Sequence, residues 1–162
     1  MTGSDTGHTH EHRPSGGAYR RFALMILTSA AVMYVVMYFN TYQLDHVYFS
    51  WTRLYMTLMS AATMAVIMLR FMRHMYTDRA RNRWIVLGSA ALFLTGLWLV
   101  RTQTFVGDAA WMRAMIPHHS IAILTSERAQ LKDPRVRALA DGIIETQKRE
   151  IAEMKGYLRD LK

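Results

Sequence analysis

Three long stretches without a charged residue alternate with short polar segments in the first two thirds of the chain. Residues 22–39, 54–69 and 84–100 each hold 16 to 18 uncharged residues in a row. An α-helix rises about 1.5 Å per residue, so each stretch approaches the roughly 30 Å thickness of the bilayer core. Flanking arginines could complete each span by reaching the interface: Arg53, Arg70, Arg73 and Arg101. We therefore predict three transmembrane helices rather than three buried helices of a soluble protein, because so short a chain has no polar surface to shield them.

Residues 105–162 have a different pattern, in which apolar positions recur every three or four residues among many charges. This period is typical of amphipathic helices. We expect one helix from an N-cap at Asp108 to about Gln130, and a second that begins with Asp133 as N-cap and Pro134 in its first turn. The short connection predicts an antiparallel helical hairpin, so the fold class is all-α.

The positive charges lie mainly beside the first three helices. The net charge is +8, of which residues 105–162 contribute only +2, so the balance does not point to nucleic acid. Basic residues gather before the first span and between the second and third: Arg13, Arg20, Arg21, Arg70, Arg73, Arg79, Arg81 and Arg83. By the positive-inside rule we expect a cytoplasmic N-terminus and an extracytoplasmic C-terminal hairpin. The first span is too long for a signal peptide, and we expect it to remain as a membrane helix.

The expected domain boundaries follow from these patterns. Residues 1–18 are polar and carry His8, His10 and His12, so we expect a disordered tail, with weak metal binding as the less favoured role. Residues 19–104 form the transmembrane domain and residues 105–162 the helical domain. Four methionines share one face of the second span, namely Met64, Met68, Met72 and Met75. We favour helix packing over metal conduction for these methionines, because no carboxylate or histidine accompanies them mid-membrane.

Soft and borderline metal ligands gather at the start of the hairpin. A helical wheel places one set on a single face: Met112, Met115, His118, His119, Ala122, Ile123 and Ser126. It places Arg113, Ser120 and Glu127 on the opposite side. Thioether and imidazole groups suit a soft or borderline transition metal, and buried imidazoles require a partner or a metal. On the second helix, Met154 could add a sulfur, while Gln147 and Glu150 could orient the histidines.

Two questions stay open on the residues alone. The histidines could instead form hydrogen bonds inside a packed core, although two adjacent histidines one turn from two methionines favour metal. In the first loop, Asp45 and His46 could join an outer metal site or only solvate the turn. The chain has no cysteine, so thiolate sites and disulfides are excluded.

At these positions the chain resembles the bacterial family catalogued as domain of unknown function 305. The resemblance covers about residues 108–161 and rests on Met-Ile-Pro-His-His at 115–119, with Asp133-Pro134, Gln147, Glu150 and Met154 in the second helix. It implies half of a ferritin-like four-helix bundle, an extracytoplasmic location and a link to copper. It would make the copper ligands Met112, Met115, His118, His119 and Met154. This chain has Thr125 where many relatives have a methionine, and one helix pair where fuller relatives have two.

Together these observations predict a protein of the bacterial inner membrane that binds copper, preferably Cu(I), for tolerance, storage or delivery. No nucleophile with a neighbouring base and no phosphate-binding loop is present, so we do not expect an enzyme. The alternatives are a structural or interaction module without metal and a subunit of a metal transport system. We expect a homo-oligomer, because Ile121 and Leu124 would leave an apolar strip uncovered.

Overall fold

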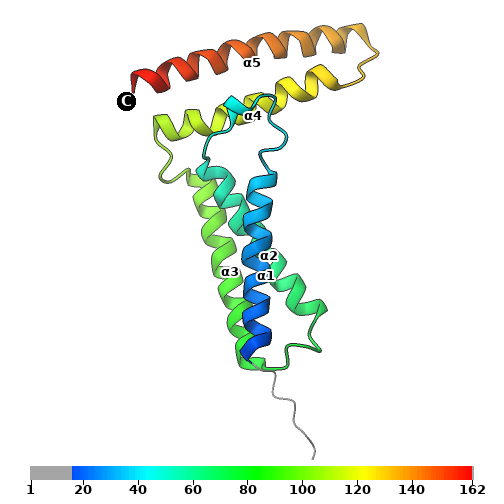
Figure 1. Cartoon of the computed structure of the whole chain (residues 1–162), viewed down its shortest axis with the longest axis vertical. Coiled ribbons are helices and arrows are strands. Elements are labelled where there is room, and N and C mark those ends of the chain that lie inside the picture. Colours follow the sequence, from blue (N-terminus) through cyan, green and yellow to red (C-terminus); the bar gives the residue numbers. More distant parts are fainter. Residues whose placement is uncertain (1–15, 162) are drawn as a thin grey trace, which may run out of the picture.

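The computed structural model describes residues 16–161, and within that range the chain folds into five α-helices and one short 3₁₀ turn, without strands. The elements are α1 (Gly16–Val36), η1 (Leu44–His46), α2 (Trp51–Phe71), α3 (Arg79–Thr102), α4 (Asp108–Arg128) and α5 (Pro134–Asp160). Figure 1 shows α1, α2 and α3 side by side in one long bundle, with α4 and α5 lying across one end of it. The prediction of an all-α chain is confirmed for the described residues.

The three helices of the bundle are each long and apolar enough to cross a membrane. Most of their apolar side chains are exposed, which a bundle of this kind tolerates only where lipid covers them. Central helix α2 packs against both α1 and α3. At the α2–α3 crossing a Cβ on Gly96 would lie 2.7 Å from Met59 Cγ, so this close approach requires glycine. The chain is thus a membrane protein with three candidate spans, as the apolar stretches predict.

Helix α1 begins at Gly16, three residues earlier than the expected start of the transmembrane domain. The prediction of disorder is therefore wrong for residues 16–18, while the rest of the expected tail, with its three histidines, lies outside the described residues. Tertiary contacts explain the extension, because Ala18 and Tyr19 pack against the buried cluster that contains Phe22 and Tyr76.

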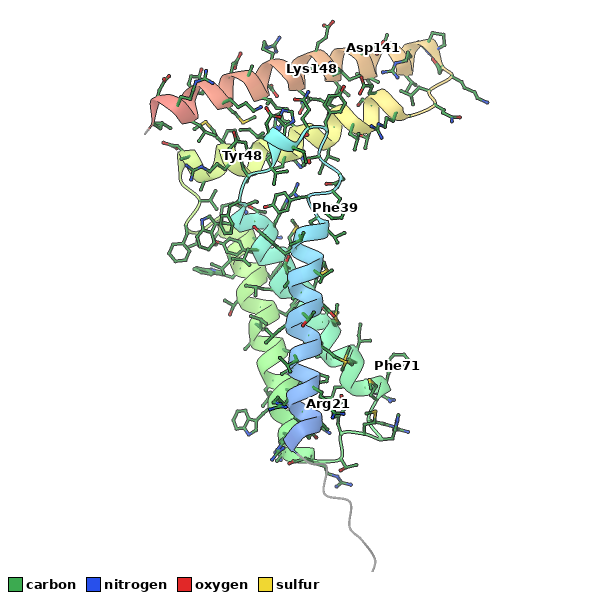
Figure 2. The ribbon with its side chains drawn as sticks, in the orientation of Figure 1. Arg21, Phe39, Tyr48, Phe71, Asp141 and Lys148 are labelled. Atoms are coloured by element: carbon green, nitrogen blue, oxygen red, sulfur yellow. The ribbon has the colours of Figure 1, made fainter. Side chains whose placement is uncertain are left out.

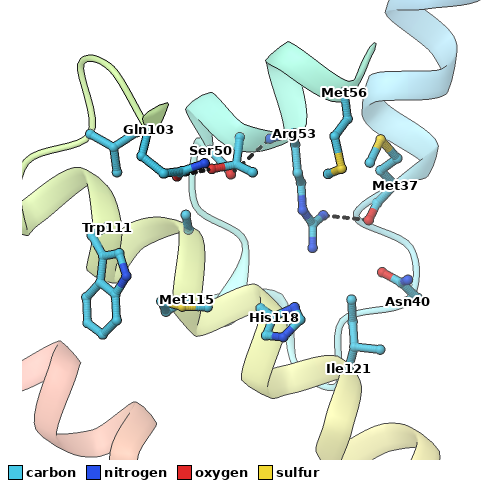
Figure 3. Close-up of a pocket in the computed structure, with 13 residues that line it drawn as sticks. Met37, Asn40, Ser50, Arg53, Met56, Gln103, Trp111, Met115, His118 and Ile121 are labelled. Carbon is cyan, nitrogen blue, oxygen red and sulfur yellow. Dashed lines mark hydrogen bonds between the residues drawn. The ribbon is translucent and has the colours of Figure 1, made fainter. Parts of the chain in front are cut away.

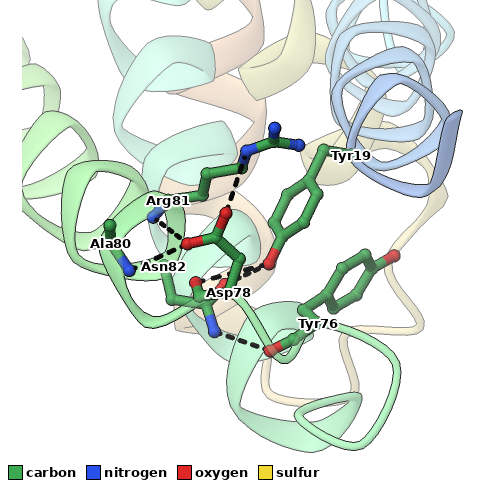
Figure 4. A network of polar contacts seen from close by, with 6 residues as sticks. All are labelled: Tyr19, Tyr76, Asp78, Ala80, Arg81 and Asn82. Carbon is green, nitrogen blue, oxygen red and sulfur yellow. Dashed lines mark hydrogen bonds and ion pairs between the residues drawn. The ribbon is translucent and has the colours of Figure 1, made fainter. Parts of the chain in front are cut away.

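Polar contacts fasten the start of α1 to the turn between α2 and α3 (Figure 4). The Tyr19 hydroxyl donates to Asn82 Oδ1 over 2.9 Å, and Asn82 Nδ2 donates to the Tyr76 carbonyl oxygen over 2.6 Å. Asp78 caps α3 by accepting from the backbone N–H groups of Ala80 and Arg81. This network closes the end of the bundle that carries most of its arginines.

The other two helices, α4 and α5, pack against each other and run in opposite directions (Figure 1). We call them the α4–α5 pair. Asp133 caps α5 through the Arg135 N–H, and Pro134 is its first residue, as predicted. The N-cap of α4 is Gly107 rather than Asp108, and α4 ends at Arg128 rather than near Gln130. Both differences are shifts of one or two residues, which terminal geometry rather than the apolar pattern decides.

The loop between α1 and α2 reaches up to the α4–α5 pair. Tyr42 and Tyr48 pack against a buried cluster of five side chains from α4 and α5: Met112, Ile116, Ile123, Ile151 and Met154. Figure 2 shows Tyr48 close to α4, while Arg21 and Phe71 lie toward the opposite end of the bundle. The core of the pair is therefore completed by residues that precede it by about 70 positions in the chain.

Candidate metal site

The side chain of His119 reaches from α4 to α5 and is held by a hydrogen bond at each ring nitrogen. Its Nδ1 lies 3.0 Å from the carbonyl oxygen of Met115, one helical turn earlier, and its Nε2 lies 2.8 Å from Glu150 Oε2. A carbonyl oxygen only accepts, so Nδ1 carries a proton and donates it. The contact between Nε2 and the carboxylate needs a proton as well, which either of the two atoms can carry. An imidazole held in this way is ready to exchange a proton for a metal ion.

Three methionines accompany His119 at the interface of the α4–α5 pair. Met112 and Met154 are buried, 5% and 6% exposed, in the same cluster but on different helices. Met115 packs against this cluster from its edge. Four of the five predicted ligands thus lie at the same helix interface, one through an imidazole and three through thioethers.

His118 is the predicted ligand that the structure separates from the others. Its side chain is exposed and lines a cavity of about 450 Å³ on the opposite side of α4, facing α2 and the α1–α2 loop (Figure 3). The ring centroids of His118 and His119 are 6.2 Å apart. Successive helical residues diverge by about 100°, so the expected single face does not hold for both histidines. Met115 borders both places.

The two residues expected to orient the histidines differ in their contacts. Glu150 meets Nε2 of His119, whereas the backbone carbonyl of Met115 fixes the proton on Nδ1. Gln147 is half-buried, and its side chain forms no hydrogen bond with the described residues. Within residues 16–161 no three histidine or carboxylate side chains come together as a metal-binding group. A metal at this interface would therefore need the thioethers.

Comparison with known proteins identifies this part of the chain. Residues 105–162 match the family described as Domain of unknown function (DUF305). This segment is a DUF305 domain. The predicted resemblance is confirmed for it. The chain is also 43% identical over 68 residues to an uncharacterized protein of Acanthamoeba polyphaga mimivirus, a match that covers 41% of this chain and 45% of the viral protein. It thus spans less than half the length of that relative. No solved structure matches the chain significantly.

The DUF305 domain is attached to the α1–α2 loop by a buried hydroxyl. Ser120 is fully buried, and its Oγ accepts the Tyr42 N–H over 2.7 Å. The same Oγ lies 2.9 Å from Nδ1 of His46, which is only 5% exposed. The side of α4 that carries Ser120, predicted to lie opposite the methionines and histidines, is therefore covered by the loop. Sequence reasoning missed this contact because its partners are 74 and 78 residues away.

Charged groups surround the same attachment. Lys155 of the DUF305 domain donates to Asp45, and this contact holds the pKa of the exposed Asp45 carboxyl below its ordinary value. Burial, assisted by the nearby Lys155 charge, lowers the pKa of His46 below its ordinary 6.5. Docking thus favours the neutral form of His46. Both loop residues therefore contact the domain: His46 through Ser120 and Asp45 through Lys155.

Proposed function

We propose that the protein is a membrane-anchored copper-binding protein that serves metal tolerance, storage or delivery. The observation that carries the proposal is the imidazole of His119, held by the Met115 carbonyl and directed at Glu150 of α5, at the interface that buries the thioethers of Met112 and Met154. Imidazole and thioether groups are soft or borderline donors, and thioethers favour Cu(I) over harder ions. When bound, copper would be held by His119 with Met112, Met115 and Met154, and Glu150 would offset its charge.

Metal analysis of paired variants tests this proposal. We expect the purified wild-type protein, loaded with Cu(I) and then desalted, to retain copper, and His119→Ala to retain much less. His118→Ala is the matched control, because it removes the neighbouring imidazole that faces the other side of α4. Met154→Leu preserves the buried volume while removing the sulfur, so it separates loss of a ligand from loss of packing. Equal retention by wild type and His119→Ala would rule out this site.

A structural or interaction module is the second candidate, and one observation favours it. His119 and Glu150 already satisfy each other at 2.8 Å without a metal. In that case Glu150→Gln should lower the melting temperature of metal-free protein, and added copper should not raise the melting temperature of wild type. A copper-dependent rise in wild type that is absent in His119→Ala would exclude this reading.

Orientation in the membrane belongs to the same proposal. The end of the bundle opposite the DUF305 domain carries the arginine-rich α2–α3 turn and the start of α1 (Figures 1 and 2). By the positive-inside rule this end lies in the cytoplasm of a bacterium, and the DUF305 domain lies outside its inner membrane. Copper binding by the DUF305 domain, outside the inner membrane, would capture the metal before it enters the cytoplasm.

The methionines of α2 divide into two groups. Met68 and Met72 pack against the cluster around Phe22, which supports the packing role favoured from the sequence. Met56, Met59 and Met64 instead line an open groove of about 620 Å³ between α2 and α3. The groove gives a transport role some support, and its test is uptake of Cu(I) or Ag(I) by vesicles containing wild type or a variant with leucine at these three positions.

Assembly into a homo-oligomer is also proposed, on a revised surface. Ile121 and Leu124 are half-buried rather than uncovered, and Ile121 lines the cavity that faces the bundle. One strip of exposed apolar side chains lies instead on α5, at Val136, Leu139 and Ile143. Pairing of two copies through this strip would give a four-helix bundle. Mass measurement in detergent, corrected for the micelle, should give a dimer for wild type and a monomer for Leu139→Glu.

A further inference from the structure

A cavity separates the DUF305 domain from the membrane helices, and it contains a buried cation. The cavity of about 450 Å³ is bounded by α4, by the first turn of α2, and by the segments that follow α1 and α3 (Figure 3). Arg53, the third residue of α2, is only 7% exposed. Figure 3 shows its guanidinium reaching into the space between Met37 and His118.

The charge of Arg53 has no anionic partner in the described part of the chain. Its Nη1 donates to the carbonyl oxygen of Met37, and the guanidinium lies over the Tyr38 ring, 4.2 Å from its centroid. No described carboxylate comes within 4.0 Å of it, and none lines the cavity. A guanidinium has five N–H donors, and a buried cation is costly unless it is paired. The cavity therefore offers an unneutralised positive charge with donors to spare.

The remaining lining is mostly apolar, with a few polar groups. Asn40, Gln103 and His118 supply further hydrogen-bonding groups, while Val106, Trp111 and Ile121 supply apolar surface. The cavity lies where the three candidate spans end, at the depth of a bilayer headgroup region. A basic, partly apolar pocket at this depth matches a lipid whose phosphate is negative and whose acyl chains begin beside it.

We propose that this cavity binds the phosphate group of an anionic phospholipid from the leaflet on the side of the DUF305 domain. Arg53 holds the phosphate oxygens by charge-assisted hydrogen bonds, and the polar groups around it complete the contact. The lipid then neutralises the buried charge and fills the space between the bundle and the domain. This site and the proposed copper site lie on different sides of α4, and Met115 borders both.

Lipid retention by the full-length protein tests the inference. Wild type and variants are reconstituted in nanodiscs of mixed phosphatidylglycerol and phosphatidylcholine, released into detergent, and analysed by native mass spectrometry. We expect wild type to retain one phosphatidylglycerol molecule. The fraction of Arg53→Gln that retains the lipid should be at least roughly tenfold smaller, because a charge-assisted hydrogen bond is lost. Arg101→Gln is the matched control, since this exposed arginine lies at the same end of the bundle but outside the cavity.

A second variant protects the test against misfolding of Arg53→Gln. Ala114 lines the cavity from α4, so Ala114→Phe should fill the space and expel the lipid without touching the arginine. Full lipid retention by a folded Arg53→Gln or by Ala114→Phe would overturn the inference. Displacement of the retained lipid by excess inorganic phosphate, or loss of selectivity over phosphatidylcholine, would also overturn it, by showing a small-anion site or a nonspecific one.

Discussion

The attachment of the α1–α2 loop to α4 gives the sharpest prediction on stability, through the substitution Ser120→Ala. The serine is fully buried, and its Oγ is the acceptor for the Tyr42 N–H and the neighbour of His46 Nδ1. Removing the oxygen leaves both groups without that partner. A buried donor left unsatisfied costs about 1–3 kcal/mol, and His46 can recover part of its loss by changing tautomer. We therefore expect the loop to be less stably docked by about 2 kcal/mol.

Hydrogen exchange measures this loss locally. The Val47 N–H donates to the Leu44 carbonyl within η1, so it reports on the loop without contacting Ser120 itself. A loss of about 2 kcal/mol raises the population of the undocked loop roughly 30-fold, and exchange at Val47 should accelerate by the same factor. The experiment compares wild type and Ser120→Ala in detergent at one pH.

Thr125→Ala is the matched control for this measurement. Thr125 also lies on α4, but its hydroxyl is exposed and bonds only to carbonyl groups of its own helix. Its removal should change exchange at Val47 by less than about twofold, since exposed substitutions have small effects. Unchanged exchange at Val47 in Ser120→Ala, with the helices still folded, would refute the role assigned to the buried hydroxyl.

Three further predictions follow from the bundle and its attachment. Gly96→Ala should lower the melting temperature, because the added Cβ would lie 2.7 Å from Met59 Cγ and overpacking costs about 1–3 kcal/mol. Gly88→Ala is the control, since the space around Gly88 is open and its melting temperature should not fall. Equal melting curves for the two variants would contradict the close crossing of α2 and α3. Because burial lowers the pKa of His46 below 6.5, docking of the α1–α2 loop on α4 should be at full strength above about pH 6.5 and weaken as the pH falls below that value. Hydrogen exchange in the loop, corrected for its intrinsic pH dependence, should show this weakening in wild type and not in His46→Gln. An alkaline phosphatase fused after Lys162 should be active, and fluorescence from a reporter that folds only in the cytoplasm would reverse the proposed orientation.

Local sequence patterns predicted the helices because each depends on neighbours within a few residues. Stretches of 16 to 18 uncharged residues must be helical to satisfy their backbone in lipid, and the structure has long apolar helices at all three places. Asp133 followed by Pro134 marks a helix start through capping and a fixed φ, and α5 begins there. The signature around His118 and His119 likewise identified the domain that residues 105–162 form.

The candidate site was only partly predictable. The sequence placed soft ligands on one helix and a further methionine on its partner, and the structure brings Met112, Met115, His119 and Met154 to one interface. A helical wheel puts His118 at the edge of the expected face and His119 nearer its centre, but it does not show which element packs against each. The packing of two different surfaces on α4 separates them, with α5 on one side and the membrane bundle on the other.

Sequence by itself therefore determined where helices form, which of them suit a membrane, and which segment carries the potential ligands. Tertiary structure alone decided that Ser120 is buried, that His46 docks beside it, and that Arg53 faces a cavity beneath α4. These contacts join residues that are far apart in the chain, and no local pattern encodes the partner. A lone polar residue on a helix looks solvent-facing in sequence until the loop that covers it is placed in space.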